Sequence, residues 1–156
     1  VDEKELKYQK ERQEDIEKYL KEQREEKVKE DQKQREYEEK YGNRNIIMFA
    51  QLESDGEIIS TNHCTMTVPK YLELERPEFD VAIKELADNK FELKVKTNKP
   101  AIMVRLELSN ADAQFTDNFF TMYAGQERTI IAEPWEPMSL EAFKAQLKIK
   151  SLVDSY

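Results

Sequence analysis

The sequence predicts an all-β sandwich preceded by a long charged α-helix, and three observations support this fold class. Residues 1–41 contain neither Gly nor Pro and consist mainly of Lys, Arg, Glu, Asp and Gln. From Ile46 onward, short runs of alternating apolar and polar residues are separated by turn signals at near-regular spacing, as in sandwiches. The apolar share of 38% is therefore an average over two different parts. We divide the chain into a charged helix, residues 1–42, and a β-sandwich with a C-terminal helix–strand tail, residues 43–156.

The composition argues against several classes of partner. The net charge is −8 at pH 7, whereas phosphate contact needs a basic face, so we expect no nucleic acid partner. No apolar run has the length that crossing a bilayer needs, so we expect no membrane partner. Cys64 is the only cysteine, which excludes an internal disulfide. The chain begins at Val1 with a charged run and no signal peptide, and we expect it to be a piece of something longer.

The charged segment is predicted to be helical because Glu repeatedly precedes Lys by four residues, a spacing that stabilises a helix by about 0.2–0.5 kcal/mol per pair. Gly42-Asn43 is a suitable end for this helix. Its apolar residues are sparse and keep no heptad, which disfavours a coiled coil without excluding it. A solvated helix, a helix docked through Ile16, Tyr19 and Leu20, and a disordered segment remain open.

The first β element is predicted to be a hairpin. Ile46–Leu52 and Glu57–Val68 are strand-like runs on either side of Asp55-Gly56, a strong hairpin signal, and Pro69 ends the second run. A connection over the surface follows, with Leu72 and Leu74 as its anchors.

The remaining strands are predicted from alternation and turns. Phe115–Tyr123 is expected to be a short aromatic strand or a bulged segment, and Ser139 is expected to cap a short helix, Leu140–Gln146. The other predicted strands are Phe79–Leu86, Phe91–Val95, Ile102–Leu108, Glu127–Glu133 and a last strand beginning at Leu147.

Few residues indicate chemistry. His63-Cys64 lacks the further ligands that a metal needs, and neighbours on a strand point to opposite faces, which disfavours a nucleophile pair. The carboxylates Asp112, Asp117, Glu133 and Glu136 are candidates for glycoside hydrolysis by residue type only. We therefore predict no catalytic residue, no metal and no cofactor in this chain.

Trp135, Asp117 and Asn118 are the candidate substrate-binding residues. Trp135 lies between two Glu-Pro pairs, where it could stack on a sugar ring or pack the tail against the sandwich or a neighbouring domain. Asp117-Asn118 could hydrogen-bond a ligand, or it could shape a turn by bonding its own backbone.

Four segments carry a resemblance to a known family: Val104–Leu106, Phe115–Phe120, Glu133–Pro137 and Ser151–Tyr156. Together they resemble the C-terminal end of the β-mannosidases of glycoside hydrolase family 2. The animal lysosomal enzymes are similar through a Phe-Ser-Asp-Asn element, a Pro-Trp-Glu-Pro element and a Ser-Leu-x-Asp-x-Tyr terminus. This match suggests that Tyr156 is a natural C-terminus, whereas residues 1–41 match nothing in the family.

The resemblance implies a C-terminal immunoglobulin-like accessory domain of a retaining β-mannosidase, an enzyme that removes terminal β-D-mannose from glycans. The catalytic Glu pair of such enzymes lies on a (β/α)₈ barrel that has no counterpart in this chain, so the chain alone should be inactive. The implied partners are other domains of the same polypeptide and, through the parent enzyme, β-mannoside glycans. For an animal parent, the implied location is the lysosome or the secretory pathway.

Two alternatives remain open beside the resemblance. The chain could be a carbohydrate-binding module with Trp135 as its platform, or a structural interaction module that uses the charged helix.

Overall fold

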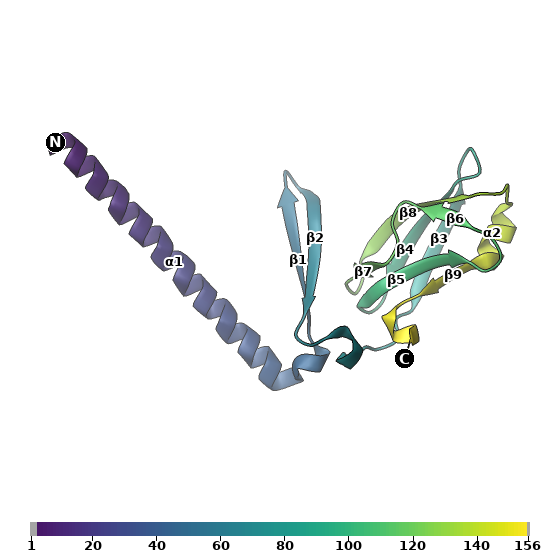
Figure 1. The fold of residues 1–156 in the computed structure, drawn as a ribbon, viewed down its shortest axis with the longest axis horizontal. Coiled ribbons are helices and arrows are strands. Elements are labelled where there is room, and N and C mark those ends of the chain that lie inside the picture. Colours follow the sequence, from purple (N-terminus) through teal and green to yellow (C-terminus); the bar gives the residue numbers. More distant parts are fainter. Residues whose placement is uncertain (1–2, 156) are drawn as a thin grey trace. The chain divides into compact units, whose positions relative to one another are not determined.

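The structure, a computed structural model, describes residues 3–155 (Figure 1). Residues up to 47 and residues 65–72 form one compact unit, and residues 48–64 and those from 73 onward form a second unit. The helices and strands, in chain order, are α1 (Glu3–Tyr41), β1 (Ile47–Ser54), β2 (Glu57–Thr65), β3 (Phe79–Glu85), β4 (Phe91–Thr97), β5 (Ala101–Leu108), β6 (Ala113–Phe115), β7 (Phe120–Met122), β8 (Glu127–Pro134), α2 (Leu140–Gln146) and β9 (Leu147–Lys150). Among the helices of this described part, none combines the length and the apolar character needed to cross a membrane.

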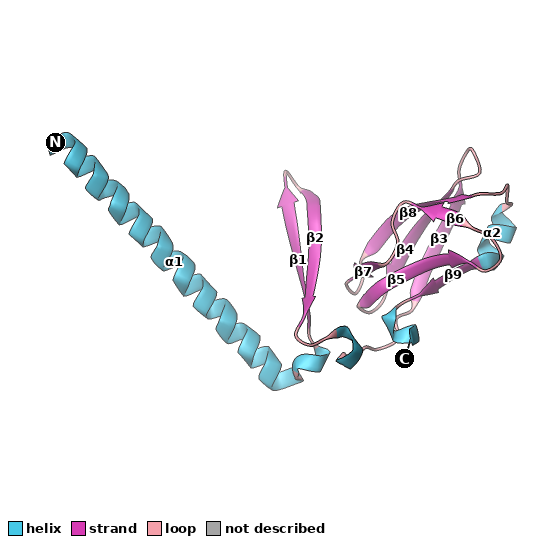
Figure 2. Ribbon diagram, in the orientation of Figure 1, coloured by secondary structure: helices cyan, strands magenta, loops and turns pink. Residues whose placement is uncertain are grey.

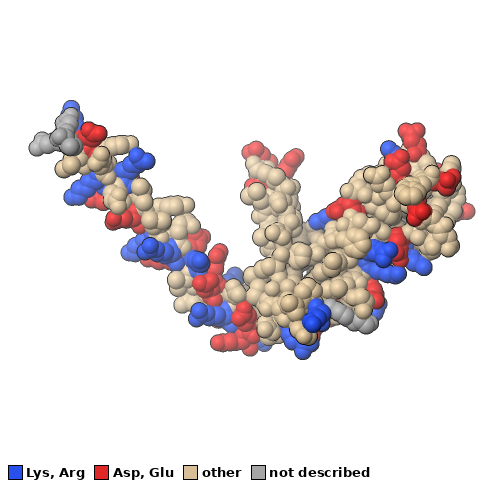
Figure 3. Space-filling model, in the orientation of Figure 1, with Lys and Arg blue, Asp and Glu red and all other residues tan. Residues whose placement is uncertain are grey.

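The helix α1 is exposed along most of its length and carries charges of both signs (Figure 3). It ends as predicted, because Gly42 has a φ of 76° and its N–H donates to the Glu38 carbonyl over 2.9 Å. The turn with Tyr19 is exposed. Within its own unit, α1 contacts the segment after β2 at Gln34, whose side-chain amide lies 3.3 Å from the sulfur of Met66.

The predicted hairpin forms, but it makes a two-stranded sheet of its own (Figure 2). Asp55 and Gly56 both have positive φ, 52° and 80°, as a type I′ turn requires. The second strand ends at Thr65, three residues before the predicted end. The hairpin was expected within the sandwich, whereas the hydrogen-bonded sheets of the sandwich begin at Phe79.

The sandwich contains seven strands in two sheets, with order β3-β4-β8-β6 in one and β7-β5-β9 in the other (Figure 2). A four-stranded sheet packed on a three-stranded sheet is the arrangement of constant-type immunoglobulin domains. All pairs are antiparallel, as alternation with short turns predicts. Two ion pairs, Lys99–Glu75 and Arg76–Asp154, join the connector before β3 to the sandwich.

The core lies between the two sheets and is closed by α2. Phe91, Leu93 and Val95 of β4 are fully buried, so the apolar face predicted from alternation is confirmed. Phe143 of α2 is also fully buried and stacks on Phe91, with ring centroids 4.2 Å apart. Ser139 caps this helix as predicted, because its hydroxyl accepts from the Ala142 N–H over 3.2 Å.

The aromatic stretch Phe115–Tyr123 is not one strand but two, and they belong to different sheets. β6 pairs with β8, whereas β7 pairs with β5. The chain therefore crosses from one sheet to the other between Phe115 and Phe120, and Asp117-Asn118 lies in this crossover.

Candidate functional site

Trp135 lies on the loop that leaves β8 and projects its side chain into solvent. The preceding Pro134 is buried, whereas 73% of Trp135 is exposed. The backbone at this position is fixed, because the Trp135 N–H donates to the Asp112 carbonyl over 3.0 Å. An exposed indole on an anchored backbone is preorganised for contact with another molecule or domain.

Asn89 holds this Trp135 loop from the β3–β4 turn. Its amide nitrogen donates to the carbonyls of Pro134 and Glu136, over 2.9 and 3.1 Å. Its amide oxygen accepts from the Met138 N–H over 2.9 Å. Asn89 has a φ of 56°, a left-handed conformation that Asn tolerates better than most residues. One side chain thus fixes both sides of Trp135.

Asp117 pairs with a cation of the neighbouring strand. Its carboxylate lies 2.7 Å from the guanidinium of Arg128 on β8. The same guanidinium lies 5.1 Å from the ring centroid of Phe120, at the start of β7. The ion pair joins the crossover to the four-stranded sheet, and it engages the Asp117 carboxylate within the sandwich.

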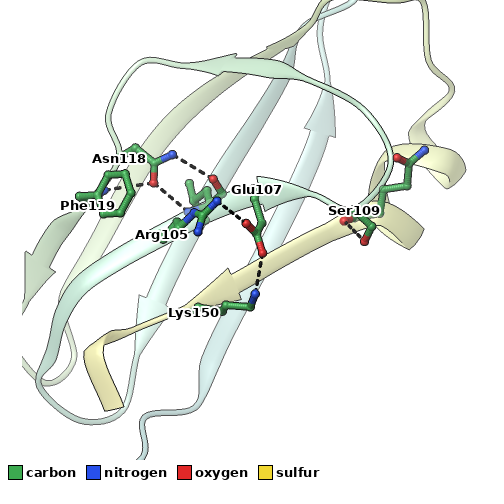
Figure 4. Close-up of polar contacts among 8 residues, drawn as sticks. Arg105, Glu107, Ser109, Asn118, Phe119 and Lys150 are labelled. Carbon is green, nitrogen blue, oxygen red and sulfur yellow. Dashed lines mark hydrogen bonds and ion pairs between the residues drawn. The ribbon is translucent and has the colours of Figure 1, made fainter. Parts of the chain in front are cut away.

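Asn118 bonds the backbone of β5 as a partner strand would (Figure 4). Its amide oxygen accepts from the Leu106 N–H over 2.8 Å, and its amide nitrogen donates to the Leu106 carbonyl over 2.9 Å. Its oxygen also accepts from the Phe119 N–H over 3.1 Å, and Phe119 has a φ of 57°. The amide thus satisfies a backbone position of β5 beside the crossover, just before β7 begins at Phe120.

A row of charges lies next to Asn118 on the outer face of β5 and β9 (Figure 4). Glu107 lies 2.7 Å from Arg105 and 2.7 Å from Lys150. The hydrogen bond from Lys150, assisted by the positive charge of Arg105, lowers the pKa of the Glu107 carboxyl below its ordinary value. These charges join β9 to β5, whose register places Arg105 opposite Lys150.

The three candidate substrate-binding residues do not form one cluster. Asp117 contacts Arg128 near the start of β8, whereas Trp135 follows the end of that strand. Seven residues of extended chain between Arg128 and Trp135 correspond to about 23 Å. Asp117-Asn118 and Trp135 are therefore separate features of the sandwich.

The other chemical candidates are also dispersed. Glu133 pairs with Lys90 over 3.5 Å, and the His63 ring lies 6.1 Å from that of Phe49 in the hairpin. Cys64 is exposed. Within residues 3–155, no group of three or more His, Cys, Asp or Glu side chains is placed to hold a metal ion.

Asn89 holds the Trp135 loop, although its place in the sequence carries only a local turn signal. The Asp88-Asn89 pair signals a turn, but nothing local indicates that the amide reaches a loop 45 residues later in the chain. The contact of Arg105 with Phe119 also has no local signal in the sequence, although its guanidinium lies 6.0 Å from the Phe119 ring centroid.

The comparison with protein families gives a match over the sandwich. The family Ig_mannosidase, described as an Ig-fold domain, matches residues 74–155, which is more than half of the chain. The chain belongs to this family. The predicted fold class, an immunoglobulin-like sandwich preceded by a long charged helix, is confirmed, as is the resemblance to the β-mannosidases.

A solved mannosidase has the same fold. The chain is similar to a β-D-mannosidase from Dictyoglomus thermophilum, with 23% sequence identity and a TM-score of 0.58 over 68% of this chain. The chain spans only 13% of that enzyme. Among curated proteins, no match was found. The chain is thus an immunoglobulin-like accessory domain of the mannosidase type.

Proposed function

We propose that this chain is an accessory domain of a retaining β-mannosidase that removes terminal β-D-mannose from glycans. The observation that carries the proposal is the family match over residues 74–155, together with the Pro-Trp-Glu-Pro and Phe-x-Asp-Asn elements. The role is structural, and the chemistry belongs to a catalytic domain elsewhere in the parent polypeptide.

The arrangement of the candidate residues supports a structural role. The polar groups of Asp117 and Asn118 are engaged within the sandwich by Arg128 and Leu106. Trp135 alone is left with a large free surface, on a loop that Asn89 fixes. An exposed, rigid Trp is the kind of residue that dominates interfaces. We therefore assign Trp135 to the contact with another domain of the same polypeptide.

The test is the activity of the native protein captured from an extract of the source organism by an antibody against residues 43–156. We expect captured material to hydrolyse an aryl β-mannoside, with an aryl α-mannoside and an aryl β-glucoside as controls. The isolated 156-residue chain should show no activity above background. Captured protein without β-mannosidase activity, or an active isolated chain, would contradict the proposal.

A carbohydrate-binding module is the second candidate, and the exposure of Trp135 is the observation that favours it. A sugar stacked on the indole would change its fluorescence. The discriminating measurement is titration of the chain with mannose and β-manno-oligosaccharides. Emission that stays constant in millimolar sugar would remove this candidate and leave Trp135 as a domain contact.

The expected cellular compartment of the parent enzyme depends on the source organism. If the source is an animal, we propose a lysosomal or secretory location. Immunofluorescence with the same antibody, compared with a lysosomal marker, tests this, and a diffuse cytosolic signal would contradict it.

A further inference from the structure

The β1–β2 hairpin carries an uncovered apolar face. Met48 and Leu52 share one face of β1 because successive side chains of a strand alternate. The two-residue turn at Asp55-Gly56 places Ile59 of β2 opposite Leu52. The exposed fractions of these side chains are 40%, 61% and 63%, respectively. Aliphatic side chains grouped on one face and exposed to this degree mark an interaction surface.

The opposite face of the hairpin contacts Tyr123. The Phe49 ring meets the Tyr123 ring edge-on, with centroids 5.7 Å apart, and the Gln51 amide donates to the Tyr123 hydroxyl over 3.2 Å. The hairpin therefore has a partner on one side within its own unit, whereas the face of Met48, Leu52 and Ile59 is exposed within that unit.

The hairpin edges are also unpaired. β1 and β2 form a two-stranded sheet, so each strand exposes one row of backbone N–H and C=O groups to which no other described strand bonds. Such a sheet is only marginally stable in water, and exposed edges readily accept another strand. An uncovered face and free edges together indicate a sheet that is incomplete in this chain.

We propose that the hairpin docks on a further β-sheet domain of the parent polypeptide, which adds a strand to a hairpin edge and covers Met48, Leu52 and Ile59. This inference rests on the proposed function, since it requires a parent enzyme. Strand addition supplies backbone hydrogen bonds, and the apolar face supplies the buried area. Acidic residues gather at the tip of the hairpin (Figure 3), namely Glu53, Asp55 and Glu57, so the partner carries basic residues where it meets this tip.

The extent of the structural similarity favours a domain of the same polypeptide over a second copy of the chain. The similarity to the bacterial mannosidase covers 68% of this chain, about 106 residues, whereas only 83 residues follow position 73. More than twenty aligned residues therefore precede the family match, which begins at residue 74. The hairpin and its connector are the elements directly before that position. The similarity therefore includes residues that precede the sandwich, and the matched part is only 13% of that enzyme, so further domains of one polypeptide are available to cover the hairpin.

The test compares amide hydrogen exchange in the isolated chain with exchange in the native protein captured from the source organism. In the isolated chain, we expect β1 and β2 to exchange rapidly while β4 stays protected in the core. In the native protein, exchange in β1 and β2 should be slower by about tenfold or more, because added hydrogen bonds and burial suppress local opening. Equal exchange of the hairpin in both samples would overturn the proposal. Protection that arises in the isolated chain as its concentration is raised would identify a second copy as occupant and would also overturn it.

A pair of variants in the full-length protein locates the covered face. Ile59→Lys should restore rapid exchange in both hairpin strands because it places a charge in the buried contact. Ser60→Lys changes the neighbouring residue on the other face and should leave exchange slow. Equal effects of the two variants would contradict the assigned face. β-Mannosidase activity, measured on the same captured sample, tests the proposed function separately. A protected hairpin in a protein without this activity would contradict only the proposed enzyme activity. Activity in a protein whose hairpin exchanges rapidly would contradict only the proposed docking.

Discussion

At the scale of single residues, the Phe-x-Asp-Asn element, residues 115–118, connects the two sheets of the sandwich. Asn118 bonds both backbone groups of Leu106, and Asp117 pairs with Arg128 across to the other sheet. The two residues hold the crossover between the sheets from its two sides. Both polar residues of the motif therefore have a structural role in the fold.

Replacing Asn118 with Ala should destabilise the sandwich by about 1–3 kcal/mol, because it leaves half-buried backbone groups of Leu106 without partners. Chemical denaturation followed by circular dichroism measures this loss. Asn110→Ala in the exposed turn after β5 is the matched control and should change the unfolding free energy by less than about 0.5 kcal/mol. Equal effects of the two variants would refute the role of Asn118.

Glu107 gives the sandwich a dependence on pH. Its hydrogen bond with Lys150 and the charge of Arg105 hold its pKa below the ordinary value of 4.5. A carboxyl with a lowered folded pKa stabilises the fold above the unfolded pKa, and this contribution is lost as the pH falls through the folded value. Glu107→Gln should thus lower the melting temperature at neutral pH, and the difference from the wild type should shrink below pH 4.5. A difference that stays constant with pH would contradict this account.

At the scale of elements, the short helix α2 closes the core. Its Phe143 is fully buried against Phe91, and its first turn is capped by Ser139. Most of its contribution comes from this one aromatic side chain, because a helix of seven residues is too short to be stable alone.

Phe143→Ala should therefore cost about 3–5 kcal/mol of unfolding free energy. The control is Phe119→Ala, since Phe119 is 58% exposed and its contact with Arg105 contributes about 1 kcal/mol or less. Denaturant titration of both variants separates the two predictions. A loss at Phe143 no larger than that at Phe119 would show that α2 does not close the core.

Most elements could be predicted from the sequence because their signals are local. The alternation of Phe91, Leu93 and Val95, the hairpin turn at Asp55-Gly56 and the cap at Ser139 each act within a few residues. What the sequence leaves open depends on residues far apart in the chain. The split of the aromatic stretch into β6 and β7 is decided by which strand each half pairs with, β8 or β5.

The candidate site also combines features that local sequence predicts with features that depend on residues far apart in the chain. The sequence singled out Trp135, Asp117 and Asn118 by residue type, but it left two roles open for each of them. Only the long-range partners Asn89, Arg128 and Leu106 reveal how these three residues are held. The observed fold also differs from the expected one at the hairpin, which forms a sheet of its own. Alternation predicts the two strands but cannot specify the sheet to which they belong.

At the scale of the whole molecule, the buried hydrophobic cluster of residues 3–155 is drawn from residues 91–143. The helix α1 contributes no residue to this cluster. The sandwich should therefore fold without the helix.

Deletion of residues 1–41 is expected to leave the thermal unfolding of the sandwich unchanged, as measured by circular dichroism at a strand wavelength. Sedimentation of both forms tests the interaction-module alternative as well. Because the apolar residues of α1 are sparse, we expect the same monomeric state with and without it. An oligomer that disappears on deletion would instead support self-association through the helix.

The measurement that tests the central claim most directly is the size of the native protein. An antibody against residues 43–156 would probe an extract of the source organism on a denaturing gel. As an accessory domain of a mannosidase, the chain should appear in a band several times larger than its own 18.5 kDa. A band near 18.5 kDa would contradict the account, because the protein would then stand alone without a catalytic domain.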